Sequence, residues 1–438
     1  MKLHGTAKIN SLNHLEIGGC DMVDIVEEYG TPLYVMDEKL IRDNCMGYIN
    51  SFSKIYDDFR VAYAGKAFLN IAMCKLVEDE GFYLDVVSGG ELYTAIKANF
   101  PPEKIIFHGN NKTEDEHKMA LKYGVGRIVV DNFNELYKLN DVAKSYNKTV
   151  DIYLRISPGI EAHTHEYIKT GQIDSKFGFP IYSGQAYEAV KIALSLENLN
   201  LIGLHCHIGS QIFEKQPYKD AAKVMVELIA EIKKRWGHEI NELDMGGGFG
   251  IYYTEKDKPM STDDIASAIV GGVIEHSKKE GVKLPAIIVE PGRSIVGNAG
   301  TTLYKIGAIK DIPGVRKYIS VDGGMVDNIR PALYKAKYEA AISDRMLDSK
   351  NEVVTVAGKC CESGDILIKD IKMPKVKEND ILAIFSTGAY GESMASNYNR
   401  IPRPAVVLVY NGKSYVISKR ETYEEIIQND VIPNRLCI

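Results

Sequence analysis

Short apolar runs alternate with amphipathic stretches along the chain from residue 38 to about residue 293. Each apolar run ends in polar or small residues, a pattern typical of buried strands. The predicted strands are Val61–Lys66, Tyr83–Ser88, Ile105–Asn110, Arg127–Asp131, Asp151–Ile156, Leu201–Ile208, Glu242–Gly247 and Ile287–Arg293. The stretches between them predict helices at Phe68–Glu80, Glu91–Asn99, Glu114–Tyr123, Asn134–Tyr146, Gln185–Leu194, Tyr218–Trp236 and Asp263–Glu280.

Strands that alternate with helices pair in parallel through right-handed crossover connections. Eight such units over roughly 250 residues match the size of a closed (β/α)8 barrel of the TIM type. An open doubly wound sheet is the alternative, but it leaves the eighth strand without an obvious place. The sequence therefore predicts a barrel over residues 38–299. Apolar helix positions such as Leu121, Leu136, Ala189 and Val226 are expected to turn inward.

The pattern changes after about residue 300, where strand-like runs replace the helices. These runs are Ile319–Val321, Val353–Val356, Ile381–Phe385, Val406–Tyr410 and Ser414–Ile417. Asn411-Gly412 between the last two is a strong signal for a two-residue hairpin. Two early strand-like runs, Leu15–Gly18 and Thr31–Met36, are expected to join this part because the barrel already has eight strands. We therefore predict a mainly β domain made of residues 1–37 and 300–438.

Composition and charge narrow the class of protein. The chain has 438 residues, which is too long for one ordinary core. Its formal net charge of −6 argues against a nucleic-acid binder, which normally presents a basic face. The sequence predicts neither a transmembrane helix nor a secretory signal. The seven scattered cysteines are expected to be free thiols in a reducing cytoplasm.

Polar residues collect where the predicted barrel strands end, which is where such barrels carry their chemistry. They are Lys66, Asp85, Ser88, His108–Asn110, Arg155, His207–Ser210, Gly246–Gly248, Glu290 and Arg293. Lys66 lies at the C-terminal end of a predicted strand, so it is a candidate catalytic amine as well as a candidate surface lysine. The segment His163–Gly178 is a candidate for a lid.

Two further motifs favour a phosphate site. Residues 246–250, Gly-Gly-Gly-Phe-Gly, let backbone N–H groups approach an anion, although a plain tight turn is the alternative. The spacing does not match a dinucleotide-binding fingerprint. Glu290 and Arg293 either form a local salt bridge or supply an acid for a basic ring nitrogen and a guanidinium for a phosphate. Ser210 and the position after strands seven and eight favour the phosphate interpretation.

His205 and His207 alternate on one strand and share a face, which suggests either a metal site or a ring that stacks on a flat cofactor. No third, well-placed carboxylate accompanies them, so we predict no metal site. A strand-end lysine, a phosphate cradle, an acid for a ring nitrogen and a stacking imidazole together indicate pyridoxal 5′-phosphate.

Seven motifs along the chain resemble those of the diaminopimelate decarboxylases, in the same order. This family belongs to a wider group of barrel-type pyridoxal phosphate decarboxylases that includes ornithine decarboxylase. The motifs are Tyr63–Ala67, His207–Gln211, Gly246–Phe249, Glu290–Arg293, Arg330–Tyr334, Cys361–Asp365 and Gly388–Gly391. A departure follows the fifth motif, where this chain reads Lys335-Ala336-Lys337-Tyr338 and many relatives have Ala-Tyr-His.

The resemblance implies a cofactor site. Lys66 would hold the cofactor covalently, Glu290 would pair with its ring nitrogen, and His207 would stack on its ring. Ser210, Gly247 and Arg293 would bind its phosphate. The full set of implied cofactor contacts is Lys66, Asp85, His207, Ser210, Gly246, Gly247, Gly248, Glu290, Pro291, Gly292, Arg293 and Tyr390.

The resemblance also implies a substrate site and a partner. Arg330 and Tyr334 would bind the distal carboxylate of the substrate, and Glu362 its distal amine. Cys361 would return a proton to the carbanion. The substrate contacts would also include Arg293 and Tyr390. The Cys361-Glu362 segment would reach the neighbouring subunit's barrel, so a homodimer with shared active sites is expected.

The implied reaction is the decarboxylation of meso-2,6-diaminopimelate to L-lysine and CO₂, the last step of lysine biosynthesis. Three alternatives stay open: a related decarboxylase of a basic amino acid or carboxynorspermidine, a non-catalytic homologue that binds the cofactor, and a racemase on the same barrel. Arg330, Tyr334 and the Cys361-Glu362 pair favour the diaminopimelate reaction.

Overall fold

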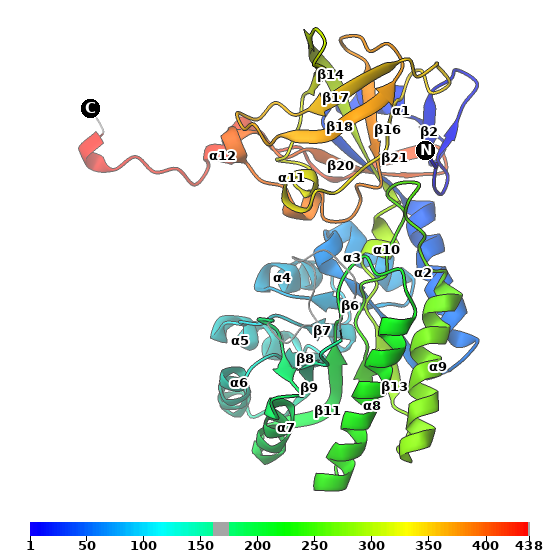
Figure 1. Cartoon of the computed structure of the whole chain (residues 1–438). Helices are drawn as coiled ribbons and strands as arrows, with labels where there is room; N and C mark the ends of the chain where they lie inside the picture. Colours follow the sequence, from blue (N-terminus) through cyan, green and yellow to red (C-terminus); the bar gives the residue numbers. More distant parts are fainter. Residues whose placement is uncertain (161–174, 437–438) are drawn as a thin grey trace. The chain divides into compact units, whose positions relative to one another are not determined.

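The computed structural model describes residues 1–160 and 175–436, and the chain forms two compact units (Figure 1). The barrel unit consists of Arg42–Tyr252 and Lys256–Ile295. The β unit consists of Met1–Ile41, Tyr253–Glu255 and Val296–Ile438. Most of the candidate lid His163–Gly178 lies outside the described residues. Among the described residues, no helix is both long enough and apolar enough to cross a membrane.

The barrel unit contains a closed ring of eight parallel strands. They are β5 (Phe59–Ala64), β6 (Tyr83–Val86), β7 (Ile105–Phe107), β8 (Arg127–Val130), β9 (Val150–Ser157), β11 (Leu199–Cys206), β12 (Glu242–Asp244) and β13 (Ala286–Val289). Strand β13 pairs with β5, with Ile288 opposite Arg60, and this pairing closes the ring. The short β10 (Phe179–Pro180) extends the sheet beside β9. The predicted (β/α)8 barrel is therefore confirmed, and the open-sheet alternative is wrong.

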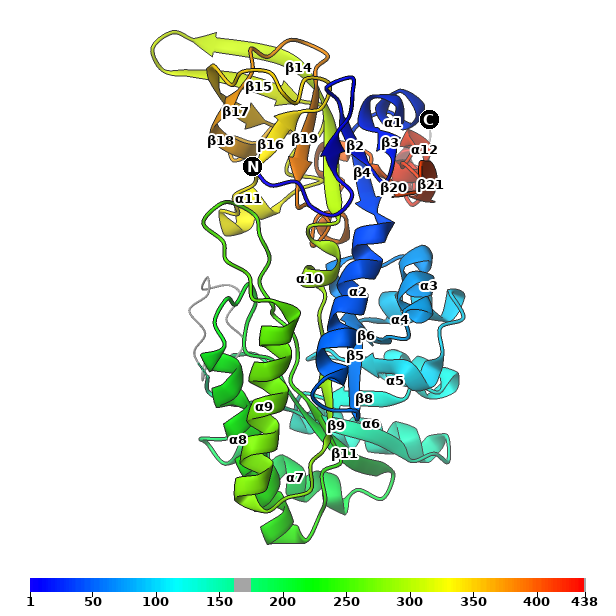
Figure 2. The same cartoon turned by 90° about the vertical axis from the view of Figure 1, so that its right-hand side faces the viewer.

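Helices surround these strands on the outside (Figure 2). They are α2 (Glu38–Ser53), α3 (Ile71–Asp79), α4 (Gly89–Lys97), α5 (Glu114–Tyr123), α6 (Phe133–Ser145), α7 (Gln185–Ser195), α8 (Gln216–Trp236) and α9 (Thr262–Glu280). Leu121, Leu136, Ala189 and Val226 are buried, as predicted. Inside the barrel, alternate strand residues such as Ala62, Ile106 and Ile288 form an apolar cluster.

Local sequence signals explain where the helices begin and end. Thr113 and Glu116 form a capping box at the start of α5, and Gly124 ends that helix in the left-handed region at φ 89°. Ser261 and Asp264 form the equivalent box at the start of α9. These side chains satisfy backbone N–H groups that a helix leaves unpaired at its first turn.

The β unit is built on a nine-stranded sheet to which both ends of the chain contribute. Its strands are β4 (Leu33–Asp37), β14 (Gly300–Ile312), β15 (Arg316–Val321), β16 (Ala340–Ile342), β17 (Glu352–Ala357), β18 (Ile366–Met373), β19 (Ile381–Phe385), β20 (Ala405–Tyr410) and β21 (Lys413–Ser418). The early strand β4 runs antiparallel to β14 and parallel to β20. The remaining strands β1 (Lys8–Ile9), β2 (Leu15–Ile17) and β3 (Cys20–Asp21) form a separate small sheet.

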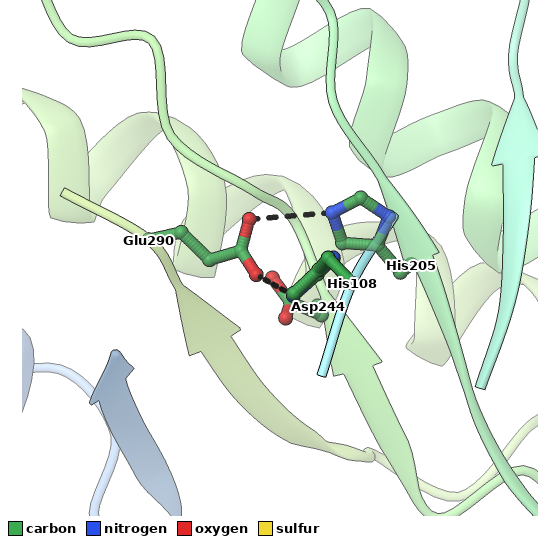
Figure 3. Close-up of side chains that lie close together, drawn as sticks. All are labelled: His108, His205, Asp244 and Glu290. Carbon is green, nitrogen blue, oxygen red and sulfur yellow. Dashed lines mark hydrogen bonds and ion pairs between the residues drawn. The ribbon is translucent and has the colours of Figure 1, made fainter. Parts of the chain in front are cut away.

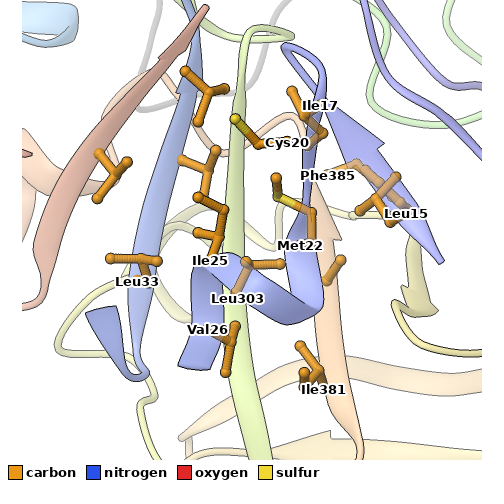
Figure 4. Packing of buried hydrophobic residues seen from close by; sticks show 14 of the residues in the cluster. Leu15, Ile17, Cys20, Met22, Ile25, Val26, Leu33, Leu303, Ile381 and Phe385 are labelled. Atoms are coloured by element: carbon orange, nitrogen blue, oxygen red, sulfur yellow. The ribbon is translucent and has the colours of Figure 1, made fainter. Parts of the chain in front are cut away.

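The core of the β unit joins apolar residues from both ends of the chain (Figure 4). Leu15 and Met22 from the N-terminal segment pack with Leu303 and Phe385. Asn411 and Gly412 both adopt positive φ angles, 49° and 74°, which confirms the predicted hairpin between β20 and β21.

Candidate active site

Lys66 lies just past the end of β5, in the 3₁₀ turn Gly65–Ala67. The predicted strand Val61–Lys66 has the length of β5 but lies two residues too far along the chain, because the chain turns once Gly65 packs against Asp85. A Cβ at Gly65 would lie 2.9 Å from the Asp85 carbonyl oxygen. The Lys66 Nζ is 3.9 Å from Asp85 Oδ2, and 40% of the lysine side chain is exposed against 1% of Asp85. The amine is thus accessible while its carboxylate neighbour is buried.

The glycine loop after β12 is shaped by backbone contacts that no other residue type allows. A Cβ at Gly247 would lie 2.1 Å from the Glu290 carbonyl oxygen, and one at Gly248 would lie 2.1 Å from the Gly209 carbonyl oxygen. Gly248 also has a φ of 93°, in the region that favours glycine. The loop therefore brings the ends of β11, β12 and β13 together as a narrow backbone cradle.

Arg293 and Ser210 meet beside this cradle. The Arg293 Nη2 donates a hydrogen bond to Ser210 Oγ at 2.8 Å, and Arg293 is 7% exposed. Gly292 packs on the end of β5, where its Cβ would lie 2.9 Å from the Ala64 Cβ. A guanidinium, a hydroxyl and a glycine loop gathered at neighbouring strand ends are suited to a phosphate group.

Glu290 is the centre of a buried polar cluster at the strand ends (Figure 3). His108 Nε2 forms an ion-pair contact of 2.7 Å with Glu290 Oε1, and His205 Nε2 hydrogen-bonds Glu290 Oε2 at 3.3 Å. Burial alone would raise the pKa of Glu290, but the two imidazoles more than offset burial and lower that pKa well below its usual range. Glu290 is therefore an ionised carboxylate inside the barrel.

Asp244 completes this cluster and differs from Glu290 in its protonation. Its Oδ1 accepts a hydrogen bond from the Gly246 N–H at 2.8 Å, and the side chain is fully buried. Burial and the negative charge of Glu290 raise the pKa of Asp244 well above its usual range. One ligand atom each from His108, His205, Asp244 and Glu290 lies within 4.8 Å of the others, which is close enough for a metal ion.

The two histidines of β11 and the loop after it have different partners. His205 contacts Glu290, whereas His207 Nδ1 accepts a hydrogen bond from the Gly247 N–H at 3.3 Å. Burial, then the charges of Lys66 and Arg155, lower the pKa of His207 well below its usual value. His207 is therefore a neutral, flat ring. The sequence placed His108 at a strand end without a role and did not single out Asp244, although His108 directly follows β7 and Asp244 ends β12.

Arg330 lies in the β unit at the start of α11 (Arg330–Tyr334) and is 7% exposed. Its guanidinium lies 4.8 Å from the Tyr253 ring centre and 5.7 Å from that of Tyr338, and it donates a hydrogen bond to the Tyr338 hydroxyl. Tyr334 is half-buried in the same helix. Across residues 1–160 and 175–436, no carboxylate forms an ion pair with Arg330. Tyr338, where the sequence departs from the family, thus contacts Arg330 directly.

Cys361 and Glu362 also lie in the β unit, on its surface. Cys361 is exposed, and its N–H donates to Asn399 Oδ1 at 2.7 Å. Glu362 accepts a hydrogen bond from the Gly364 N–H at 3.0 Å. Tyr390 is half-buried with a φ of 59°. The predicted cofactor residues therefore lie in the barrel unit, apart from Tyr390, and the predicted substrate residues lie in the β unit, apart from Arg293.

A family model described as "Pyridoxal-dependent decarboxylase, pyridoxal binding domain" matches residues 43–297. The barrel and its strand-end lysine, carboxylate and glycine cradle agree with this match. The chain therefore belongs to the pyridoxal-dependent decarboxylases, and its cofactor is pyridoxal phosphate, as the sequence predicted.

Similar proteins show which family of pyridoxal-dependent decarboxylases the chain resembles. The chain is 53% identical to the diaminopimelate decarboxylase of Bacillus subtilis strain 168, over 98% of each chain, and 54% identical to that of Bacillus methanolicus, over 96% of this chain and 98% of the relative. The chain belongs to the diaminopimelate decarboxylase family. A solved structure of the M. jannaschii diaminopimelate decarboxylase with L-lysine superposes with a TM-score of 0.92 at 39% identity, covering 98% of this chain and 99% of that one.

Proposed function

We propose that the protein removes CO₂ from meso-2,6-diaminopimelate to form L-lysine, the last step of lysine biosynthesis, and so acts as a carboxy-lyase. The observation that carries the substrate assignment is Arg330. It is a buried cation surrounded by tyrosine rings, and no carboxylate of the described residues pairs with it. A substrate with a second carboxylate would satisfy this guanidinium. The two Bacillus relatives, each matched over 98% of its own length, bear the same activity in their names.

The barrel residues fit pyridoxal phosphate on the geometry described above. Lys66 would hold it through its amine, and the glycine cradle with Ser210 and Arg293 would bind its phosphate. When bound, the cofactor supplies an electron sink for the carbanion that loss of CO₂ leaves. Glu290, as a buried anion, would hold a proton on the ring nitrogen, and the neutral ring of His207 would pack against the cofactor face.

The β-unit residues would select the substrate and complete the reaction. Arg330 and Tyr334 would bind the distal carboxylate, Glu362 would bind the distal amine, and Cys361 would return the proton. The exposed position of Cys361 supports a role toward a second subunit, and we propose a homodimer with shared active sites. The expected cytoplasmic location stays a prediction.

Turnover by the purified holoenzyme tests the reaction. With meso-diaminopimelate we expect CO₂ and L-lysine in equal amounts, and with ornithine or lysine almost none. Turnover of ornithine without turnover of diaminopimelate would contradict the proposal and favour a decarboxylase of basic amino acids. Binding of the cofactor without turnover of any of these substrates would favour a non-catalytic homologue.

Mixed dimers test the shared site. Lys66→Ala and Cys361→Ala subunits, each inactive alone, are co-expressed with different tags. If each site takes Lys66 from one subunit and Cys361 from the other, random pairing restores about a quarter of the wild-type activity. Mixtures that stay inactive while forming dimers would show that each site draws both residues from one subunit.

A further inference from the structure

Glu290 and three other buried side chains from different strand ends of the barrel form one cluster (Figure 3). His108 directly follows β7, His205 lies in β11, Asp244 ends β12, and Glu290 directly follows β13. The strands β11, β12 and β13 are neighbours, whereas β7 lies elsewhere in the ring. The cluster therefore depends on closure of the barrel, and the proposed cofactor chemistry uses only Glu290 from it.

Each oxygen of Glu290 has its own imidazole neighbour. Oε1 lies 2.7 Å from His108 Nε2, and Oε2 lies 3.3 Å from His205 Nε2. The two rings also pack edge to face, with centres 4.8 Å apart and planes at 70°. Each imidazole thereby holds the other in place, and rotation of the Glu290 carboxylate would separate both contacts at once.

His205 is a neutral imidazole, so only one of its two ring nitrogens carries a proton. Burial lowers the pKa of His205 to about 3. Its Nδ1 is buried without a hydrogen-bond partner among the described residues, so the proton on Nε2 is the one that meets Glu290. The ring is thus an N–H donor toward the carboxylate.

Other charged groups also face this carboxylate. In their ionised forms Asp85 and Asp244 would repel its negative charge, whereas Arg155 would attract it. Asp85 and Asp244 both have raised pKa values, for which burial is the first cause. The nearest groups that favour an anionic Glu290 are therefore the two histidines.

We propose that His108 and His205 are positioning residues, which orient the Glu290 carboxylate and hold it as an anion so that it keeps the cofactor's ring nitrogen protonated. This inference rests on the proposed role of Glu290. A metal ion held by the same four side chains is the competing interpretation. Such an ion would occupy the Glu290 oxygens that the ring nitrogen needs.

The protonation of the ring nitrogen is measured directly by ¹⁵N NMR of the holoenzyme, loaded with pyridoxal phosphate labelled at that nitrogen and titrated with base. Removal of one donor, in His108→Leu or His205→Leu, should lower the pH at which the ring nitrogen loses its proton by roughly one to two units. His108→Gln and His205→Gln keep an N–H donor near the Nε2 position and should bring the titration pH most of the way back to the wild-type value.

Two controls separate the possible failures. His117→Leu removes another buried histidine, whose Nε2 lies 3.3 Å from Glu135 Oε1, and should leave the titration unchanged. Glu290→Gln must itself lower the titration midpoint. If it does not, the proposed role of Glu290 fails, whereas an effect of Glu290→Gln without any effect of the leucine variants overturns this inference alone.

The wild-type holoenzyme gives an independent result if the leucine variants fold poorly. With ¹⁵N-labelled histidine, His205 should be neutral and protonated at Nε2. Protonation at Nδ1 instead would overturn the proposal. Treatment with a chelator should leave the ring-nitrogen titration unchanged, and a change would identify a metal site in place of the positioning pair.

Discussion

Arg127 and Glu242 form a two-pronged ion pair between the first residues of β8 and β12, at the opposite strand ends from the candidate cofactor site. Their atoms approach at 2.8 Å for Nη2 to Oε1 and 2.9 Å for Nε to Oε2. The Tyr153 hydroxyl also donates to Glu242. The side chains are only 15% and 10% exposed, so the ion pair is largely desolvated. It lies at the N-terminal face of the barrel, which contributes to stability rather than to catalysis.

Glu242→Gln should destabilise the barrel because it leaves the Arg127 charge buried without its partner. We expect the free energy of unfolding to fall by roughly 3–5 kcal/mol, measured by denaturant titration. The double variant Arg127→Met/Glu242→Met should recover part of this loss, because it removes both charges. A loss confined to turnover, with unfolding unchanged, would contradict the structural role.

The same pair predicts how stability depends on pH. Burial would raise the pKa of Glu242, but hydrogen bonds from Arg127 and Tyr153 offset it and lower the pKa. The folded state therefore binds this proton more weakly than the unfolded chain. The stabilisation is complete above the unfolded value of about 4.3 and is lost as the pH falls through the folded value. The difference in stability between wild type and Glu242→Gln should accordingly shrink on acidification.

Gly248→Ala should damage the phosphate cradle. Its φ of 93° disfavours a side chain, and an added Cβ would lie only 2.1 Å from the Gly209 carbonyl oxygen. We expect the affinity for pyridoxal phosphate to fall by at least about tenfold, measured by cofactor titration of the apoenzyme. Gly271→Ala is the matched control. Gly271 lies inside α9 with no atom within 4 Å of its Cβ, so alanine should stabilise the helix by about 0.5–1 kcal/mol.

Glu290→Gln should impair turnover far more than cofactor binding. A well-placed charged partner of a developing charge contributes about 3–4 kcal/mol to transition-state stabilisation. The kcat should therefore fall by roughly a few hundred-fold, while the protein still takes up the cofactor. Near-normal kcat in this variant would exclude Glu290 from holding the ring-nitrogen proton.

Arg330→Met should remove the preference for a substrate with a distal carboxylate. Loss of a buried, hydrogen-bonded charge pair amounts to about 2–5 kcal/mol, or about 30- to 5,000-fold in the ratio of kcat/KM for diaminopimelate over ornithine. Arg316→Met is the control, because Arg316 also lies over a tyrosine ring, 5.9 Å from the centre of Tyr318, but pairs with Asp370. An unchanged ratio in Arg330→Met would disprove the assignment.

The barrel could be predicted because its strands and helices carry regular patterns. The strands β14 and β18 were not predicted. β14 changes from buried to exposed along its length and contains two glycines, so no period-two alternation is visible. β18 is interrupted at Asp370, where φ is 55°.

The candidate site also contains residues that could be predicted from the sequence and contacts that could not. Lys66, Glu290 and the glycine loop follow strands and have recognisable chemistry, so their neighbourhood could be inferred. The pairing of His108 with Glu290 depends on which strands face each other across a closed ring. The contact of Tyr338 with Arg330 depends on a turn after α11 that Lys335 makes with a positive φ of 54°. Neither contact has a local sequence signal.

The place of β4 between β14 and β20 has a consequence during synthesis. Both neighbours of this fully buried strand are made after the barrel, with roughly 260 residues between β4 and β14. At 5–20 residues per second, the ribosome takes about 13–50 s to add them. Throughout that interval the nascent chain carries an apolar strand with two open edges, a form prone to aggregation. The barrel can close first, and a truncated product that ends before β14 would keep this strand exposed as a target for chaperones and proteases.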